Sequence, residues 1–302
     1  MNILLTGSNG FIGSHVAEYL KAQGHYIVGL GRKQHCTDSL FVDEYLCCDL
    51  STPDTYLIPK MSSVRIDAIV HLAADMRKEP YCVDVLSANC CGTQRLLELC
   101  DKEGIKTFLQ LSSLPVIGHP IHHPITEDHP IHPYTVYHIT KYTEELLANY
   151  AYEYHGIRTA SFRISAPVGP RMNPHTIFPT FVRKALANED LVLLGNGTRK
   201  QSYLYVKDIA RCIESSLATD CVHGIYNLSS GILLSNLELA ETIIQTLDSK
   251  SSIVFNGIDP ADSYVWNVST ERITNDAEFV PAGKIEDIIK EYAVYLNDII
   301  ND

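Results

Sequence analysis

The first 165 residues alternate short, almost continuously apolar runs with longer stretches of helical spacing. The apolar runs cover residues 3–5, 27–30, 68–72, 108–111 and 159–164. Between them, residues 11–23 and 87–103 carry apolar side chains every three or four positions, and each stretch is followed by a glycine. Such runs are typical of parallel strands covered on both faces, and the glycines mark helix ends. The pattern predicts an α/β protein with a Rossmann-type, doubly wound parallel sheet.

Beyond about residue 167 this alternation weakens, although helical segments and short strands continue. A chain of 302 residues with 45% hydrophobic residues is long enough for two lobes. We expect a Rossmann domain over residues 1–166 and a smaller C-terminal α/β lobe over residues 167–302, with some exchange of segments between them. Ser235 and Glu238 predict a capping box at the start of one C-terminal helix.

The charge balance and the termini constrain partners and location. Twenty-four Lys and Arg residues against 36 Asp and Glu residues give a net charge of −12, which argues against binding to nucleic acid or to anionic membranes. There is no apolar run of about 18 residues and no basic leader, so we expect a cytoplasmic protein. Residues 119–133 hold five histidines and four prolines. We interpret them as an irregular loop and expect no metal site.

A glycine-rich turn follows the first predicted strand and opens the first predicted helix. Gly7 permits a tight turn, Gly10 lets the backbone approach a pyrophosphate, and Gly13 lets the helix pack closely on the sheet. The amide groups at the helix N-terminus then face the phosphates. In this position the motif predicts binding of a dinucleotide.

The second predicted strand ends at Gly31, where NAD-binding sites normally place an acidic residue for the ribose 2′-hydroxyl. Arg32 and Lys33 follow instead. Two cations would attract a 2′-phosphate, so we expect NADP to be favoured over NAD as the NAD(P) cofactor. The alternative is that both cations only solvate a loop.

Three Tyr-x-x-x-Lys spacings occur, and only Tyr137 with Lys141 falls in a helical pattern. On a helix these two residues lie one turn apart on the same face. The ammonium stabilises the phenolate and lowers the tyrosine pKa from its usual value of about 10. Such a pair can exchange a proton with a carbinol or carbonyl while hydride moves. Ser112 and Ser113 end the fifth strand, at the edge of the sheet where ligands bind.

These features together resemble the extended short-chain dehydrogenase/reductase family, in its NAD(P)-dependent sugar-nucleotide epimerase/dehydratase branch. The resemblance covers nearly the whole chain. It is carried by Thr6-Gly-x-x-Gly-x-x-Gly13, Asp49-Leu50, His71-Leu72-Ala73-Ala74, Asn89 with Gly92-Thr93, Ser112-Ser113 with Gly118, Thr126-Glu127, Tyr137-x-x-x-Lys141, Gly169-Pro170-Arg171 and Val206-Lys207-Asp208-Ile209-Ala210.

The resemblance implies a catalytic set of Ser113, Tyr137 and Lys141, with Tyr137 as general acid/base. It also implies a set of cofactor-binding residues, namely Gly7, Asn9, Gly10, Phe11, Ile12, Gly13, Arg32, Lys33, Asp49, Leu50, Leu72, Ala73, Ala74, Asn89, Ser112, Tyr137 and Lys141. The C-terminal lobe would close over a small-molecule substrate, a nucleoside-diphosphate sugar.

By the same resemblance, helices near residues 83–103 and 137–154 would pair with their copies in a homodimer. Tyr142, Leu146 and Tyr150 recur at four-residue spacing, which an interface and ordinary core packing explain equally well.

Several positions depart from the family pattern. Leu114 and Pro115 replace the acidic pair of the 4,6-dehydratases, which disfavours water elimination. Ala166 and Gln201 replace an Asn and an Arg that contact the sugar nucleotide. Arg171 and Arg199 are two other cations that either substitute for the missing one or are simply solvated at the surface.

The sequence therefore predicts an NAD(P)-dependent epimerase or reductase that transfers hydride at a carbinol or ketone carbon of a sugar-nucleotide-type substrate. One alternative is an NADPH-dependent 4-ketoreductase of a sugar nucleotide or another small carbonyl compound. An alternative of another class is a non-catalytic dinucleotide-sensing scaffold. The sequence leaves the choice between epimerase and ketoreductase open.

Overall fold

The computed structural model describes residues 1–301 apart from 37–38, 78, 80 and 262. Within this part of the chain, seven strands form one parallel sheet in the order β10-β6-β5-β4-β1-β2-β3. The strands are β1 (Asn2–Thr6), β2 (Tyr26–Gly31), β3 (Glu44–Cys47), β4 (Ala68–His71), β5 (Thr107–Ser113), β6 (Arg158–Ile164) and β10 (Gly224–Leu228). The chain order reverses beside β1, so the sheet is doubly wound, and the predicted fold class is confirmed.

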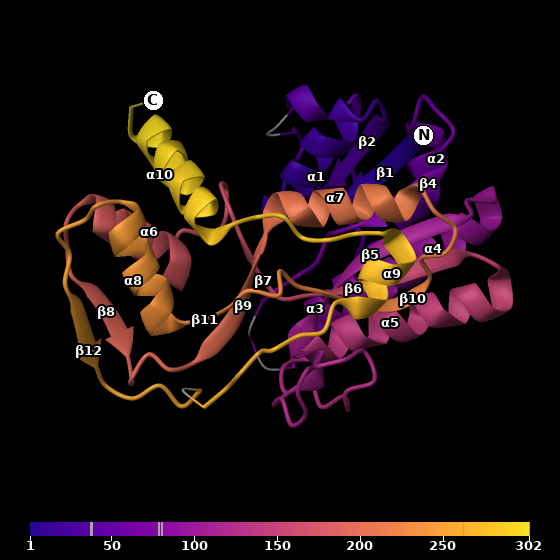
Figure 1. Cartoon of the computed structure of the whole chain (residues 1–302). Coiled ribbons are helices and arrows are strands. Elements are labelled where there is room, and N and C mark those ends of the chain that lie inside the picture. The colour runs from indigo at the N-terminus through magenta and orange to yellow at the C-terminus, as the bar shows by residue number, and fades with distance from the viewer. Residues whose placement is uncertain (37–38, 78, 80, 262, 302) are drawn as a thin grey trace.

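Helices cover both faces of this sheet (Figure 1). One face carries α1 (Phe11–Ala22), α7 (Val206–Leu217) and α9 (Glu271–Ala277), and the other carries α2 (Ile58–Met61), α4 (Gly92–Glu103) and α5 (Val136–His155). Successive residues of a strand point to opposite faces. Ile3 and Leu5 accordingly pack with α1 and α7 in one buried cluster, whereas Leu4 packs with α4 in another.

The helical stretch expected over residues 87–103 is longer and irregular. It begins with α3 (Val83–Leu86), passes through a π-helical segment, η3 (Ser87–Cys91), and continues as α4. A π-helical segment adds a residue to a turn and is frequent at functional sites. Here it carries the buried Asn89.

A smaller lobe is built from the C-terminal part of the chain (Figure 1). In the described residues it holds a three-stranded sheet of β7 (Ala166–Val168), β9 (Lys200–Tyr205) and β11 (Leu233–Ser235), and a pair of β8 (Leu191–Leu194) with β12 (Ile253–Asn256). Its helices are α6 (Ile177–Leu186), α8 (Asn236–Thr246) and α10 (Ile285–Asn301). The capping box of Ser235 and Glu238 is confirmed.

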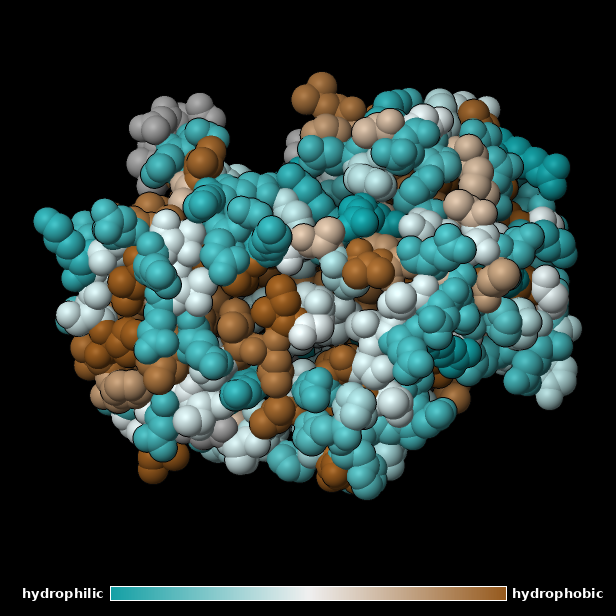
Figure 2. Space-filling view, viewed as in Figure 1, coloured by the Kyte–Doolittle hydropathy of each residue, from teal (hydrophilic) through white to brown (hydrophobic). Residues whose placement is uncertain are grey.

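The C-terminal part also contributes to the larger lobe. Helix α7 packs on α1, and β10 pairs with β6 at the edge of the main sheet. Short 3-10 turns complete the larger lobe: η1 (Ser39–Phe41), η2 (Pro53–Leu57) and η4 (Leu114–Ile117). In Figure 2, apolar side chains gather over the smaller lobe, while the surface of the larger lobe is mostly hydrophilic in this view. Among the described residues, no helix is both long and apolar enough to cross a membrane.

A buried ion pair joins α5 to the sheet. Arg163 on β6 donates from Nη2 to Glu145 Oε2 at 2.7 Å and from Nε to Oε1 at 2.9 Å. The side chains are only 2% and 0% exposed. A bidentate pair of this kind fixes both the distance and the rotation of a helix.

Replacing one partner of this pair is expected to destabilise the protein strongly, because the other charge stays buried without compensation. We expect Arg163→Met to lower the free energy of unfolding by about 3–5 kcal/mol at neutral pH. The control is Lys102→Met, which removes an exposed pair with Glu98 and should cost less than about 1 kcal/mol. Urea denaturation measures both. Equal losses in the two variants would contradict this assignment.

Candidate active site

A cavity of about 1210 Å³ opens at the carboxyl edge of the parallel sheet, between the two lobes. In doubly wound folds this edge is where ligands bind. The cavity is large enough for a dinucleotide together with a second ligand. Its lining includes every residue that the sequence predicted for the cofactor and for catalysis.

The glycine turn from residue 7 to residue 13 forms one end of this cavity. Gly7 has a φ of +71°, and a Cβ atom there would lie 2.8 Å from the amide nitrogen of Ala73. A Cβ atom on Gly13 would lie 2.0 Å from the carbonyl oxygen of Gly7. In the part of the chain that the structure describes, no side chain caps the first turn of α1. The turn therefore brings bare backbone and helix amide groups to the cavity, which fits the phosphates of a dinucleotide.

Thr6 and His71 fix the neighbouring wall of the cavity. Thr6 Oγ1 accepts hydrogen bonds from the amides of Leu72 and Ala73, both at 3.1 Å. His71 contacts the same oxygen at 2.7 Å and Thr93 Oγ1 at 3.1 Å. Burial lowers the pKa of His71 to about 3, so this imidazole stays neutral.

The loop after β2 places two exposed cations, Arg32 and Lys33, on the cavity wall. Asn9 Nδ2 donates to the hydroxyl of Tyr45 at 3.0 Å, and this hydroxyl donates to the carbonyl of Lys33 at 2.9 Å. A Cβ atom on Gly31 would lie 2.8 Å from the Tyr45 hydroxyl. The Tyr45 hydroxyl therefore occupies part of the space that a side chain at position 31 would take, and it would have to shift to admit one. Asn9 has a positioning role that its motif did not indicate.

Tyr137 and Lys141 lie one turn apart at the start of α5 and both line the cavity. Thr135 caps this helix by accepting from the amide of His138. Lys141 lowers the pKa of Tyr137, as predicted, but it is not the largest influence on that pKa. Burial raises the pKa of Tyr137 above its usual value, and Lys141 offsets this only in part. The expected net decrease in the pKa is wrong for the protein alone, because desolvation outweighs the ammonium.

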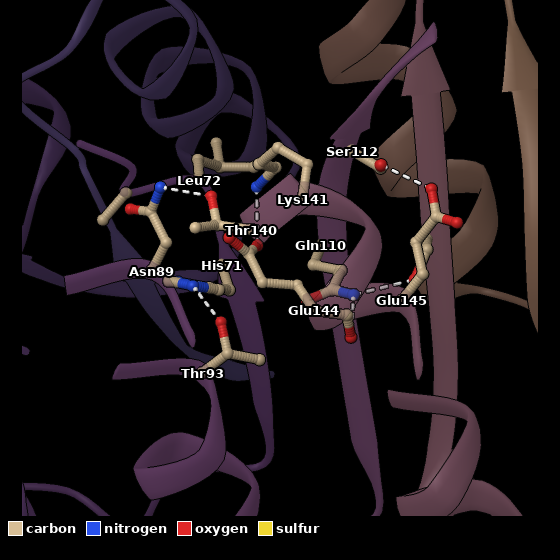
Figure 3. Close-up of polar contacts among 12 residues, drawn as sticks. His71, Leu72, Asn89, Thr93, Gln110, Ser112, Thr140, Lys141, Glu144 and Glu145 are labelled. Carbon is tan, nitrogen blue, oxygen red and sulfur yellow. Dashed lines mark hydrogen bonds and ion pairs between the residues drawn. The ribbon is translucent and has the colours of Figure 1, made fainter. Parts of the chain in front are cut away.

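Lys141 itself is held by Glu144. Lys141 Nζ donates to Glu144 Oε2 at 2.6 Å, and both side chains are buried (Figure 3). Burial acts to lower the lysine pKa, but Glu144 and Tyr137 outweigh it, so the pKa of Lys141 is raised and the ammonium is kept. Burial raises the pKa of the Glu144 carboxyl, and Lys141 only partly reverses this. Sequence reasoning missed Glu144. Its only signal was its place three residues after Lys141 on the buried face.

The two serines at the end of β5 have different surroundings. Ser112 donates its hydroxyl to Glu145 Oε1 at 2.5 Å and is buried (Figure 3). Ser113, the next residue, points to the other side of the strand and is only partly buried at the cavity wall. Ser113 is therefore partly open to the cavity, whereas the hydroxyl of Ser112 holds α5 to the sheet.

The side chain of Asn89 is also occupied by hydrogen bonds within the protein. Its amide accepts from the Asp75 amide at 2.7 Å and donates to the Asp75 carbonyl at 3.0 Å and to Thr140 Oγ1 at 2.9 Å. It thereby ties the loop after β4 to α5. Asp49 and Leu50 lie at the cavity wall after β3, where Asp49 accepts from the amide of Ser51.

The substrate side of the cavity carries the residues that depart from the family pattern. Leu114, Pro115, Ala166 and Gln201 all line it, together with Arg199. The side-chain Nε of Arg199 is buried and has no hydrogen-bond partner among the described residues. Trp266 lines the same wall and packs with Leu114, Val116 and Ile117 in a buried cluster, so it is a packing residue as well as a cavity residue.

Arg171 is not available as a substitute clamp. It donates to Glu18 Oε2 at 2.7 Å and contacts His15 Nδ1 at 2.8 Å, which joins the turn after β7 to α1. The interpretation of Arg171 as a replacement cation is wrong, because its guanidinium is occupied away from the cavity. The histidine-rich loop is irregular as predicted. Within the described ranges, no three His, Cys, Asp or Glu side chains are arranged to hold a metal ion.

The sequence is similar to a family of known proteins over most of its length. The sequence model of the "NAD dependent epimerase/dehydratase family" matches residues 3–229. The low-salt glycan biosynthesis protein Agl12 of Haloferax volcanii is 30% identical over 261 residues, which are 82% of this chain and 83% of that protein. A dTDP-glucose 4,6-dehydratase of Streptomyces griseus is 29% identical over 225 residues, 73% of this chain and 69% of that enzyme.

A solved structure agrees with the fold over its whole length. The UDP-glucose 4-epimerase of Thermotoga maritima, crystallised with UDP-glucose, has a TM-score of 0.88 at 22% identity and covers 99% of this chain and 100% of its own. At this identity the likeness establishes the arrangement of elements and nothing finer.

Proposed function

The chain belongs to the NAD-dependent epimerase/dehydratase family, as its motifs predicted, and on this premise we propose that it transfers hydride at a carbinol or ketone carbon of a nucleoside-diphosphate sugar. The observation that carries the proposal is the arrangement of Ser113, Tyr137 and Lys141. Two of these residues share one face of α5, the third ends β5, and all three line the cavity that begins at the glycine turn. This is the geometry that proton exchange beside a bound dinucleotide requires.

In this mechanism each residue has a separate task. The nicotinamide cofactor, when bound, accepts or supplies the hydride. Ser113 holds the substrate oxygen by a hydrogen bond, and Tyr137 takes the proton from that oxygen or returns it. Lys141 keeps a positive charge beside the phenol and stabilises the phenolate. The glycine turn binds the cofactor phosphates through its backbone amides.

Substrate recognition is assigned to the wall formed by both lobes. The buried Nε of Arg199 offers a cation and an unused donor, which suits a diphosphate. We disfavour dehydration, because Leu114 and Pro115 carry no group that transfers a proton. The similarity to a 4,6-dehydratase leaves this preference to experiment.

Tyr137→Phe removes the acid/base while keeping the ring. We expect turnover of a nucleotide sugar to fall by about 10²–10⁴-fold, because general acid/base catalysis contributes that much. Dinucleotide binding, measured by calorimetry, should be unchanged. Tyr152→Phe, on an exposed side chain of the same helix, is the matched control. Unchanged turnover in Tyr137→Phe would instead favour a non-catalytic dinucleotide-sensing scaffold.

We propose further that the cofactor is NADP in preference to NAD, because Arg32 and Lys33 line the cavity and Gly31 carries no acidic side chain beside them. The double variant Arg32→Ala/Lys33→Ala should bind NADPH at least about a hundredfold more weakly and NADH almost as before, since each of the two charged hydrogen bonds contributes about 1.5–3 kcal/mol and about 1.4 kcal/mol is a factor of ten. Lys102→Ala is the control. Wild-type protein that binds NADH more tightly than NADPH would contradict the preference.

The choice between an epimerase and a 4-ketoreductase follows from the fate of the cofactor. An epimerase returns the hydride to the same carbon and keeps its dinucleotide, whereas a ketoreductase exchanges NADPH in every cycle. Retained dinucleotide in the ultraviolet spectrum of the purified protein would favour the epimerase. Stoichiometric loss of NADPH with a 4-keto sugar nucleotide would favour the reductase.

A homodimer is proposed on the outer face of α5. Leu146 and Tyr150 are 50% and 54% exposed, so core packing does not explain them, whereas Tyr142 packs against the buried cluster near η4. Val83 and Leu86 on α3 are exposed as well. Apolar side chains at helical spacing on a surface indicate a partner helix.

Introducing a charge on this face should separate the subunits. We expect Leu146→Glu to behave as a monomer in sedimentation velocity at concentrations where the wild type is a dimer, because the carboxylate would be buried unpaired. Val192→Glu, on the exposed face of β8, is the control and should remain dimeric. A monomeric wild type would contradict the proposal.

A further inference from the structure

Glu144 lies beneath the proposed catalytic pair and has no part in the mechanism given above. Its side chain is 1% exposed, that of Lys141 is 4% exposed, and the two are joined by a hydrogen bond of 2.6 Å. Glu145, the next residue, instead pairs with Arg163 and accepts a hydrogen bond from Ser112 (Figure 3). Two successive carboxylates on one helix thus serve separate partners.

We propose that Glu144 is a positioning residue that acts on Tyr137 through Lys141, and that the protonation state of its carboxyl determines how readily Tyr137 releases its proton. The proposal rests on the proposed function, since the proton concerned is the one that Tyr137 exchanges with the substrate.

The charges of the three side chains carry this inference. When Glu144 is ionised, Lys141 and Glu144 together are neutral, and loss of the Tyr137 proton leaves an uncompensated negative charge in a buried site. When Glu144 is protonated, loss of the same proton forms a neutral pair of phenolate and ammonium. Uncompensated buried charge is strongly unfavourable. An ionised Glu144 carboxylate therefore disfavours deprotonation of Tyr137, and a protonated Glu144 carboxyl favours it.

Among the groups that surround it, Glu144 has Lys141 as its partner of opposite charge. The titratable and charged groups around the pair are Tyr137 and Glu145 on α5, His71 on β4, Cys90 on η3 and, beyond Glu145, Arg163 on β6. His71 is neutral, burial raises the pKa of the Cys90 thiol to about 11, and Arg163 is engaged by Glu145. Lys141 is the cation that remains for Glu144 among these groups.

The hydrogen bonds around Glu144 are incomplete. Its Oε1 is buried without a hydrogen-bond partner in the described chain, and so is Oε1 of Gln110. Gln110 lies close by, because its Nε2 donates to the backbone carbonyl of Glu144 at 3.0 Å (Figure 3). A buried acceptor without a donor is costly, and a proton on the carboxyl converts that acceptor into a donor. Burial also raises the pKa of Glu144 to about 7, so both forms are accessible near neutral pH.

The pH dependence of turnover tests the proposal. Glu144→Gln keeps the shape of the side chain and removes its charge, so Tyr137 should release its proton more readily. We expect the acidic limb of the pH profile of kcat for carbinol oxidation to move down by about one pH unit, which is about tenfold in rate at a fixed pH on that limb. KM for the nucleotide sugar should stay within about twofold. Glu144→Asp, which keeps the charge, should restore the limb toward its wild-type position.

Two further variants separate this role from a structural one. Glu153→Gln removes an exposed carboxylate from the same helix and should leave the limb in place. Glu144→Met is a second uncharged variant, for use if Glu144→Gln does not fold, and should move the limb in the same direction. A loss of stability without movement of the limb would mean that Glu144 only supports the fold, and the proposal would be overturned.

A measurement without substrate distinguishes this proposal from the proposed function. The ionisation of Tyr137 is obtained as the difference between ultraviolet titrations of the wild type and of Tyr137→Phe. The same difference, taken in the Glu144→Gln background, should lie about one pH unit lower. If it lies lower but no sugar is turned over, the role of Glu144 stands and the proposed reaction fails. If it does not move, the inference about Glu144 fails whatever the reaction is.

Discussion

Helix α5 is held against the sheet by charged side chains, and the position of the proposed catalytic residues Tyr137 and Lys141 depends on them. Most helices of a globular protein bury an apolar stripe, but the buried face of α5 includes Thr140, Lys141, Glu144 and Glu145. Burying ion pairs brings little net stability, because desolvation offsets the attraction. The pair of Glu145 with Arg163 on β6 instead imposes one distance and one rotation on α5, and this places Tyr137 at the cavity.

The fold and the outline of the site could be predicted from the sequence because they depend on local patterns. A strand buried on both faces is apolar throughout, a glycine turn is required wherever a Cβ atom would collide, and a four-residue spacing on a helix defines a face. These rules located Gly7, Gly13, Tyr137 and Lys141 at one cavity. Local patterns do not predict that α7 and β10 pack in the larger lobe, because this depends on contacts between segments far apart in the chain.

The tasks of individual polar residues could not be predicted, because each depends on a partner far away in the chain. Ser112, Asn9 and Asn89 share motifs with the cavity, yet their side chains bond Glu145, Tyr45 and the Asp75 loop. Arg171 is likewise occupied by α1. The sequence located these residues near the cavity, and only the three-dimensional contacts show that their side chains also hold its wall together.

The central claim is that hydride leaves a sugar carbon for a bound nicotinamide. The direct measurement is a single turnover, with enzyme in excess, on nucleotide sugars that carry deuterium at the carbinol carbon, followed by mass spectrometry of both the sugar and the cofactor. The account predicts that the deuterium is kept, either on the reduced cofactor or, if an epimerase returns the hydride, on the same carbon of the sugar. Conversion of the sugar with deuterium lost to solvent and none on the cofactor would contradict it, because that outcome requires proton abstraction from carbon instead of hydride transfer.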